Sequence, residues 1–152
     1  QQQQQQQPEA AAAVTFLDTP GHAAFSKMRH CGLSSTDILV LVIAADDGVS
    51  EQTDEILDLY KQHQHHMNLV IAMTKIDKPG IQLQESTTNI ENELIMRGIE
   101  TQGVGGNVPV LPVSGITGDG LENLVQTLSD YSEGLLYNHT HPEGIGVGLD
   151  GR

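Results

Sequence analysis

The run ILVLVIA at Ile38–Ala44 constrains the fold more than any other part of the sequence. Apolar residues that follow one another without alternation are typical of a strand buried on both faces. Leu69–Met73 and Val108–Val113 have the same character, and Val14–Leu17 is predicted to form a further strand that ends at Asp18. Strands of this kind predict a parallel sheet covered by helices.

Helical stretches lie between these strands. One helix is expected from Glu51 to about Gln62 with Ser50 as its N-cap, and a second from about Ser86 to Met96, where Gly98 ends it. A third is expected to begin at Asp119. The alternation predicts an α/β fold with a doubly wound, mostly parallel sheet and flanking helices. The apolar residues that define the helical faces are Ile56, Tyr60, Ile90, Leu94, Leu121, Leu124, Val125 and Leu128.

The composition excludes some classes of partner. The 152 residues suffice for one domain with a core, and 7 Lys plus Arg against 20 Asp plus Glu give a net charge of -13. Such an acidic chain lacks the basic surface that coats DNA. The longest apolar run, Ile38–Ala45, is far shorter than the ~20 residues of a membrane helix. We therefore expect neither DNA nor a membrane as a partner.

The two ends of the chain differ from its middle. Gln1–Gln7 is a homopolymer followed by proline and alanines, so residues 1–13 are expected to be a disordered linker or insertion. The folded domain is expected to span residues 14–135. The glycine-rich residues 136–152 are expected to be a linker toward a following domain.

Ligands of doubly wound sheets bind beyond the carboxyl ends of the strands, so the loops there carry the functional information. The loop after the first predicted strand is Asp18-Thr19-Pro20-Gly21-His22. A carboxylate at a strand end can hold Mg²⁺ through water, and Gly21 lets a backbone N–H approach a phosphate. The alternative is an ordinary turn, because Asp, Pro and Gly are turn residues.

Two later loops could hold a base. Thr74-Lys75-Ile76-Asp77-Lys78-Pro79 presents a carboxylate that can accept two hydrogen bonds from guanine, beside a lysine stem that can lie along its face. The alternative is a capped loop with a solvated ion pair. Ser114-Gly115-Ile116-Thr117-Gly118 is a loop of small residues whose N–H groups could face a ligand carbonyl.

Three loops in this order resemble the nucleotide-binding loops of GTPases. The longer text resembles the GTPase domain of bacterial and organellar translation initiation factor two, over roughly residues 14 to 135. The segments that carry this resemblance are VTFLDTPGHAAF at Val14–Phe25, Met28-Arg29, DILVLVIAADDG at Asp37–Gly48, Gln52-Thr53, TKIDKP, and GVGGNVPVLPVSGITGDGLENL at Gly103–Leu124.

The resemblance implies GTP or GDP with Mg²⁺ as ligands. It implies that Asp18 reaches Mg²⁺ through water, that the Gly21 amide senses the γ-phosphate, with Thr19 and Pro20 beside it, and that His22 is the catalytic residue that positions the attacking water.

It also implies that Asp77 reads guanine, that Lys75 flanks the base, and that the Ser114–Gly115 backbone contacts guanine O6. Thr74 and Ile116 belong to the same GTP-binding loops. Two departures follow. Thr74 stands where the family has asparagine, and Gly115-Ile116 stands where it has alanine followed by lysine or leucine.

A phosphate-binding loop of the form G-x-x-x-x-G-K-[ST] occurs nowhere in these residues. In the family that loop lies upstream, after a strand that sits between the strands starting here at Val14 and Ile38. The expected sheet is therefore incomplete toward its N-terminus. We expect the 152 residues alone to bind nucleotide poorly and to be marginally stable.

The function implied by the resemblance is GTP hydrolysis on the ribosome during initiation, with initiator tRNA bound by domains outside this chain. The glutamine tract favours a eukaryotic gene and an organelle, a mitochondrion above all; a bacterial chain would be cytoplasmic. The alternative is a degenerate, non-catalytic binding module. A dehydrogenase is disfavoured because no G-x-G-x-x-G follows a strand.

Two clusters are interpreted as structural. His63, His65 and His66 resemble metal ligands, but we expect a surface loop. Asp46-Asp47-Gly48 resembles a cation loop, but without EF-hand spacing we expect a turn at the end of a strand.

Overall fold

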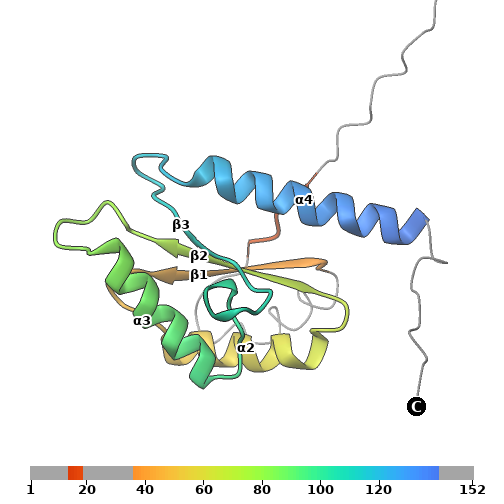
Figure 1. The fold of residues 1–152 in the computed structure, drawn as a ribbon. Coiled ribbons are helices and arrows are strands. Elements are labelled where there is room, and N and C mark those ends of the chain that lie inside the picture. The colour runs from red at the N-terminus through yellow and green to blue at the C-terminus, as the bar shows by residue number, and fades with distance from the viewer. Residues whose placement is uncertain (1–13, 19–35, 141–152) are drawn as a thin grey trace, which may run out of the picture.

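The computed structural model describes residues 14–18 and 36–140. In the second range the elements follow one another as strand, helix, strand, helix, a short 3-10 turn, strand and helix (Figure 1). Their bounds are β1 Ile38–Ala44, α2 Glu51–His63, β2 Asn68–Thr74, α3 Leu83–Met96, η2 Gln102–Val104, β3 Val110–Pro112 and α4 Leu121–Thr140. None of the described helices has the length and apolar character needed to cross a membrane.

The described strands form one parallel sheet in the order β1-β2-β3. β1 and β2 pair along their whole length, from Ile38 opposite Asn68 to Ala44 opposite Thr74. β3 is shorter than the predicted strand, and Val108 contributes only an isolated bridge to Thr101. Pro109 and Pro112 have no N–H for the ladder, which limits how far β3 can pair. The predicted α/β class with a parallel sheet is confirmed.

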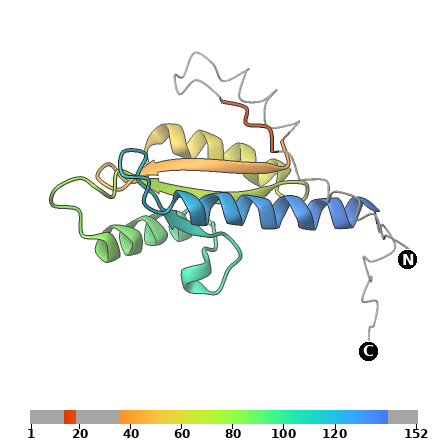
Figure 2. The same cartoon turned by 90° about the horizontal axis from the view of Figure 1, so that it is seen from above.

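Helices cover both faces of the sheet. α2 and α3 lie on one side and α4 on the other (Figures 1 and 2). The core between the sheet and α2 and α3 includes Leu57 on α2 and Leu94 on α3, which pack with alternate residues of β1 and β2. On the α4 side, Val70 and Ala72 of β2 and Leu128 of α4 are buried. β2 is thus covered on both faces, as its continuous apolar run predicts.

The predicted strand Val14–Leu17 is wrong. These residues have no regular secondary structure, and Phe16 and Leu17 are 72% and 62% exposed. A strand exists only where another strand can pair with it. Within the described part of the chain nothing pairs with the outer edge of β1, and the strand expected between Val14–Leu17 and β1 by the resemblance is not among the described strands.

The helix that follows β1 agrees with the prediction and α3 differs from it at its start. Ser50 caps α2: its hydroxyl accepts the Thr53 N–H at 3.3 Å. α3 begins at Leu83, three residues earlier than predicted. The prediction missed this start because the residues that follow Leu83 in the first turn are polar and show no apolar periodicity. It ends as predicted before Gly98, whose φ of 77° is the left-handed conformation of a helix stop.

α4 differs from the prediction at both ends. It begins at Leu121 and not at Asp119, whose carboxylate accepts a hydrogen bond from the Thr117 hydroxyl at 2.7 Å in the preceding turn. It continues to Thr140, five residues past the expected boundary at 135, so this part of the expected linker is helical. Of its apolar face, Leu128 is buried whereas Val125 is 58% exposed.

Candidate functional site

The loops that follow β1, β2 and β3 all leave the same edge of the sheet, because the strands are parallel. Backbone hydrogen bonds continue between them past the strand ends. The Ala45 N–H donates to the Thr74 carbonyl at 2.9 Å, and the Val113 N–H donates to the Met73 carbonyl at 2.8 Å. The three loops therefore start from a common, rigid base.

The loop after β1 is a tight turn. The N–H groups of Asp47 and Gly48 both donate to the Ala44 carbonyl, at 3.1 and 3.0 Å. The Glu93 carboxylate of α3 accepts the Val49 N–H at 3.0 Å and so anchors the chain where it enters α2. The predicted turn at the end of this strand is confirmed, and it holds the Asp46 and Asp47 side chains at the edge of the sheet.

The loop after β2 contains a strained residue. Lys75 has a φ of 62°, and it is the one non-glycine residue with a positive φ in the described ranges. A side chain in this conformation costs about 1–3 kcal/mol and persists only where its surroundings hold it. The Lys78 N–H closes the turn by donating to the Lys75 carbonyl at 3.2 Å.

Four charges connect these two loops. The Lys75 ammonium lies 3.0 Å from a carboxylate oxygen of Asp47 and 3.3 Å from one of Asp46, and the Lys78 ammonium pairs with the other oxygen of Asp46. We call Asp46, Asp47, Lys75 and Lys78 the four-charge cluster. Lys78, and then Lys75, lower the pKa of Asp46, although its partial burial opposes them. Asp47, and then Asp46, raise the pKa of Lys75.

The loop after β3 holds the carboxylate of the loop after β2. Ser114 is fully buried, and its hydroxyl donates to Asp77 Oδ1 at 2.6 Å. The same hydroxyl oxygen accepts the N–H groups of Ile116 and Thr117, at 3.2 and 3.1 Å. Within the described residues, the Gly115 N–H has no acceptor. The Ile116 side chain is 87% exposed.

The structure thus brings together one half of the predicted site. Thr74, Lys75, Asp77 and the loop Ser114–Ile116 lie at one edge. Asp18 is exposed, in a segment without regular structure. The other predicted residues lie outside the described residues: Thr19, Pro20, Gly21 and His22.

Asp46 and Asp47 are contact residues that the sequence analysis missed as part of this edge. Their signal was present, because two carboxylates follow one strand and two lysines flank the carboxylate after the next. In the described part of the chain, no group of three or more His, Cys, Asp or Glu side chains has a geometry that could hold a metal ion.

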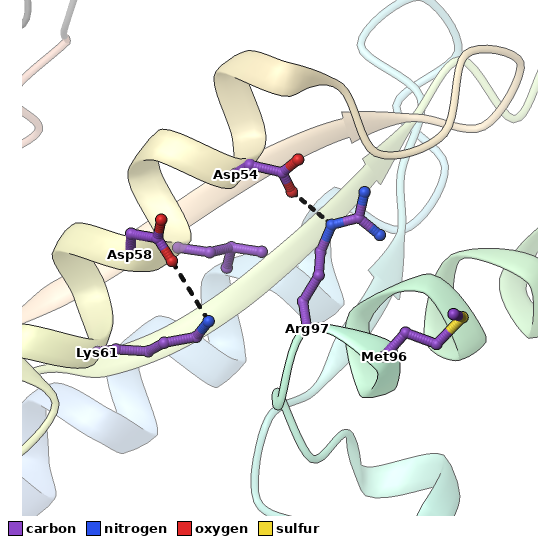
Figure 3. A pocket seen from close by; sticks show the side chains of 6 residues that line it. Asp54, Asp58, Lys61, Met96 and Arg97 are labelled. Carbon is purple, nitrogen blue, oxygen red and sulfur yellow. Dashed lines mark hydrogen bonds and ion pairs between the residues drawn. The ribbon is translucent and has the colours of Figure 1, made fainter.

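A second feature is a groove of about 490 Å³ between α2 and the C-terminal end of α3. Figure 3 shows Arg97, at the end of α3, directed toward Asp54 of α2, with which it forms an ion pair. Lys61 pairs with Asp58 at 3.4 Å along α2. Met96 lines the groove and is 88% exposed. Asp54 raises the pKa of Arg97.

The chain is similar in sequence to known translation initiation factors. A translation initiation factor IF-2 of the bacterium Parvibaculum lavamentivorans is 40% identical over 136 residues, which are 90% of this chain and 14% of that protein. The chloroplastic translation initiation factor IF-2 of Pyropia yezoensis is 39% identical over 120 residues, 79% of this chain and 15% of that protein. The chain therefore spans about one seventh of the length of these relatives.

The fold is shared with a solved structure, GDP-bound aIF5B from Aeropyrum pernix. The TM-score is 0.57 at 22% identity, over 64% of this chain and 21% of that one. The profile of the Elongation factor Tu GTP binding domain matches residues 2–133. This chain belongs to the family of elongation factor Tu GTP-binding domains.

Proposed function

We propose that residues 14–135 form the base-reading part of the GTPase domain of a translation initiation factor two. The observation that carries this proposal is the bond between Ser114 and Asp77, which holds one carboxylate at the carboxyl edge of the sheet. Guanine presents two adjacent N–H donors, and a carboxylate can accept both. Asp77 Oδ2 makes no hydrogen bond with any described residue and is available for this purpose.

Selectivity for guanine would follow from the same geometry. Adenine presents a ring acceptor where guanine presents N1–H, so an adenine base would leave the Asp77 carboxylate facing a lone pair. Sites built to hydrogen-bond a ligand reject analogues that leave their polar groups unpaired. The Gly115 N–H, without an acceptor in the described residues, would donate to guanine O6.

The departures from the family pattern bear on affinity. Thr74 cannot offer the amide donor of an asparagine. Gly115 and Ile116 replace alanine and lysine or leucine, but the contact proposed here uses the backbone and tolerates this change. We therefore expect base selectivity to persist while affinity is reduced.

The phosphate side is proposed on the resemblance alone. Asp18 would hold Mg²⁺ through water, which suits an exposed carboxylate, and the ion would neutralise phosphate charge. Gly21, with Thr19 and Pro20, would contact the γ-phosphate, and His22 would orient the attacking water. No phosphate-binding loop occurs in the 152 residues, so we expect the chain alone to bind GDP only at millimolar concentration, about -4 kcal/mol.

The activity of the whole protein is likewise a proposal. The relatives' names support a role in translation initiation, and the GTP-binding domain family supports GTP hydrolysis. Action on the ribosome, with initiator tRNA bound by other domains, is proposed on the resemblance alone. The relatives come from a bacterium and a chloroplast, and the glutamine tract favours an organelle, for which we retain the mitochondrion. Imaging of the tagged endogenous protein would decide the compartment.

Base reading is tested by titrating the isotopically labelled wild-type chain and its Asp77→Asn variant with GDP, ADP and xanthosine diphosphate. The dissociation constant of each nucleotide is measured from the chemical-shift changes of the backbone amides. Xanthine carries a carbonyl where guanine carries its amino group, so an asparagine amide would favour xanthine. We expect wild type to prefer GDP, Asp77→Asn to prefer the xanthine nucleotide, and the control Asp58→Asn on α2 to match wild type. Equal responses to GDP and ADP in wild type would refute base reading.

The intact mass of the endogenous protein, captured with an antibody against α3, distinguishes the GTPase from the non-catalytic binding module. A mass far above 16.4 kDa, with a phosphate-binding loop in the additional sequence, supports the GTPase. A mass near 16.4 kDa means that the cell makes a chain without this loop, and supports the binding module.

A further inference from the structure

The four-charge cluster connects the turn after β1 to the loop that carries Asp77. Asp46 is its centre, because one oxygen lies 3.3 Å from the Lys75 ammonium and the other pairs with Lys78. The Asp46 side chain is 20% exposed, whereas those of Lys75 and Lys78 are 45% and 52% exposed. Asp47 adds a second carboxylate on Lys75, at 3.0 Å.

The two lysines stand on either side of the base-reading carboxylate. Lys75 precedes Asp77 by two residues and Lys78 follows it directly. Past Thr74, the backbone of this loop closes on itself through the Lys78 N–H, and Ser114 holds Asp77 from the β3 side. On the β1 side, the charged side chains of the loop pair with Asp46 and Asp47, and the Ile76 side chain packs against the core cluster that includes Leu41 and Ile43.

We propose that Asp46 and Asp47 are positioning residues for the base-reading loop. They fix both flanks of Asp77 through the two lysines and help to hold Lys75 in its left-handed conformation. They do not touch the nucleotide themselves. This inference rests on the proposed function, because it assigns to the turn after β1 a part in how Asp77 meets guanine.

The size of the effect follows from the exposure of the groups. An isolated exposed ion pair contributes little, because solvent and salt screen it. Here two lysines share one carboxylate and a third charge pair is added, which is the networked case in which surface charges matter. We expect each single variant to change loop order and nucleotide affinity by roughly three-fold, and the double variant by roughly ten-fold.

The experiment compares Asp46→Asn, Asp47→Asn and the double variant in the full 152-residue chain. The control is Asp58→Asn, which removes an exposed carboxylate paired with Lys61 at 3.4 Å on α2. The first measurement is amide hydrogen exchange at Lys78, whose N–H closes the loop. The second is titration with GDP. We expect faster exchange and weaker GDP binding in the Asp46 and Asp47 variants and no change in the control.

Two further variants separate positioning from general damage to the fold. Asp46→Glu keeps the charge on a longer stem and should recover most of the wild-type exchange rate. The charge exchange D46K/K78D restores one pair in reverse and should recover more than either single variant. Adding 1 M NaCl to wild type should reproduce much of the effect of Asp46→Asn, because the pairs are exposed.

The outcomes distinguish this inference from the proposed function. Unchanged exchange and GDP affinity in the double variant, while Asp77→Asn still alters base preference, overturns the positioning role and leaves base reading intact. If amide exchange is faster in the double variant but Asp77→Asn leaves the base preference unaltered, base reading is overturned. The role of the four-charge cluster in nucleotide binding is then overturned as well. Faster exchange with weaker GDP binding, rescued by Asp46→Glu, supports both.

Discussion

β1 and β2 are adjacent strands of nearly equal apolar character, but their surroundings differ. Every residue of Leu69–Met73 in β2 is at most 3% exposed. In β1, Leu41 and Ile43 face the core under α2 and α3, whereas Val42 on the opposite face is 60% exposed. The sheet is complete around β2 and incomplete beside β1, at least within the described ranges.

The same difference divides the candidate site. The loops after β2 and β3 are joined through the buried Ser114, and they form the part that would read a base. The segment that would meet phosphate, after Val14–Leu17, begins from exposed residues without regular structure. The described strands and loops thus hold Asp77 in place without any contribution from Val14–Leu17.

The largest expected loss of stability is at Gly120, which lies just before α4 and packs against the end of β3. Its φ is 75°, and a Cβ there would overlap the Pro112 carbonyl oxygen at the end of β3. Gly120→Ala should lower the free energy of unfolding by about 3 kcal/mol or more, from backbone strain together with the clash. Urea denaturation measures this.

Gly118→Ala is the matched control for Gly120→Ala. Gly118 has a φ of 84° with no atom within 4 Å of the added Cβ, so it carries the strain alone, about 1–2 kcal/mol. Equal losses in the two variants would mean that the junction between β3 and α4 is looser than described.

The second prediction tests the difference between the two strands directly. Val70 of β2 and Val42 of β1 lie on the same face of the sheet, and they are 0% and 60% exposed. Val70→Ala should cost about 2 kcal/mol, from lost burial and the cavity that remains, and Val42→Ala within about 0.5 kcal/mol. Urea denaturation of both variants checks this, and similar losses would show that Val42 is covered in solution.

The fold was largely predictable because β1 and β2 are continuous apolar runs and the polar residues between them fit helices. The strand at Val14–Leu17 was not, because its formation depends on a neighbouring strand and no local pattern reports one. The start of α4 was missed because the Asp119 carboxylate can either cap the helix or accept a hydrogen bond in the preceding turn. In the structure it accepts the hydrogen bond of the Thr117 hydroxyl.

Within the site, order along the chain placed Asp77 and Ser114 at one edge. It could not reveal that Lys75 and Lys78 pair with Asp46 and Asp47, because that depends on side-chain reach between two loops 28 and 32 residues apart.

The third prediction concerns the bond that organises the base side. Ser114→Ala removes the donor to Asp77 and the acceptor for two backbone N–H groups of its own loop. Losing a buried hydroxyl with these bonds should cost about 1–2 kcal/mol in urea denaturation. It should also weaken the preference for GDP over ADP. Intact preference at reduced stability would restrict Ser114 to a purely structural role.

The smallest effect is the pH dependence of the four-charge cluster. Lys78 and Lys75 hold the pKa of Asp46 below its ordinary value of 3.8. A carboxyl whose pKa is lower in the folded state stabilises that state above the unfolded pKa, and this contribution is lost as the pH falls through the folded pKa. The difference in stability between wild type and Asp46→Asn should therefore be constant from pH 7 to about pH 5 and shrink only below it.

Urea denaturation of both chains over this range tests the sign as well as the size. If the difference vanished near pH 6, the Asp46 carboxyl would be protonated more easily in the folded chain than in the unfolded one. The two lysines would then not be its partners in solution. A difference that persists down to about pH 5 and is abolished by 1 M NaCl at pH 7 would instead identify the pairing as electrostatic and exposed. Such a pairing lets the turn after β1 adjust the loop that carries Asp77 without becoming part of the core.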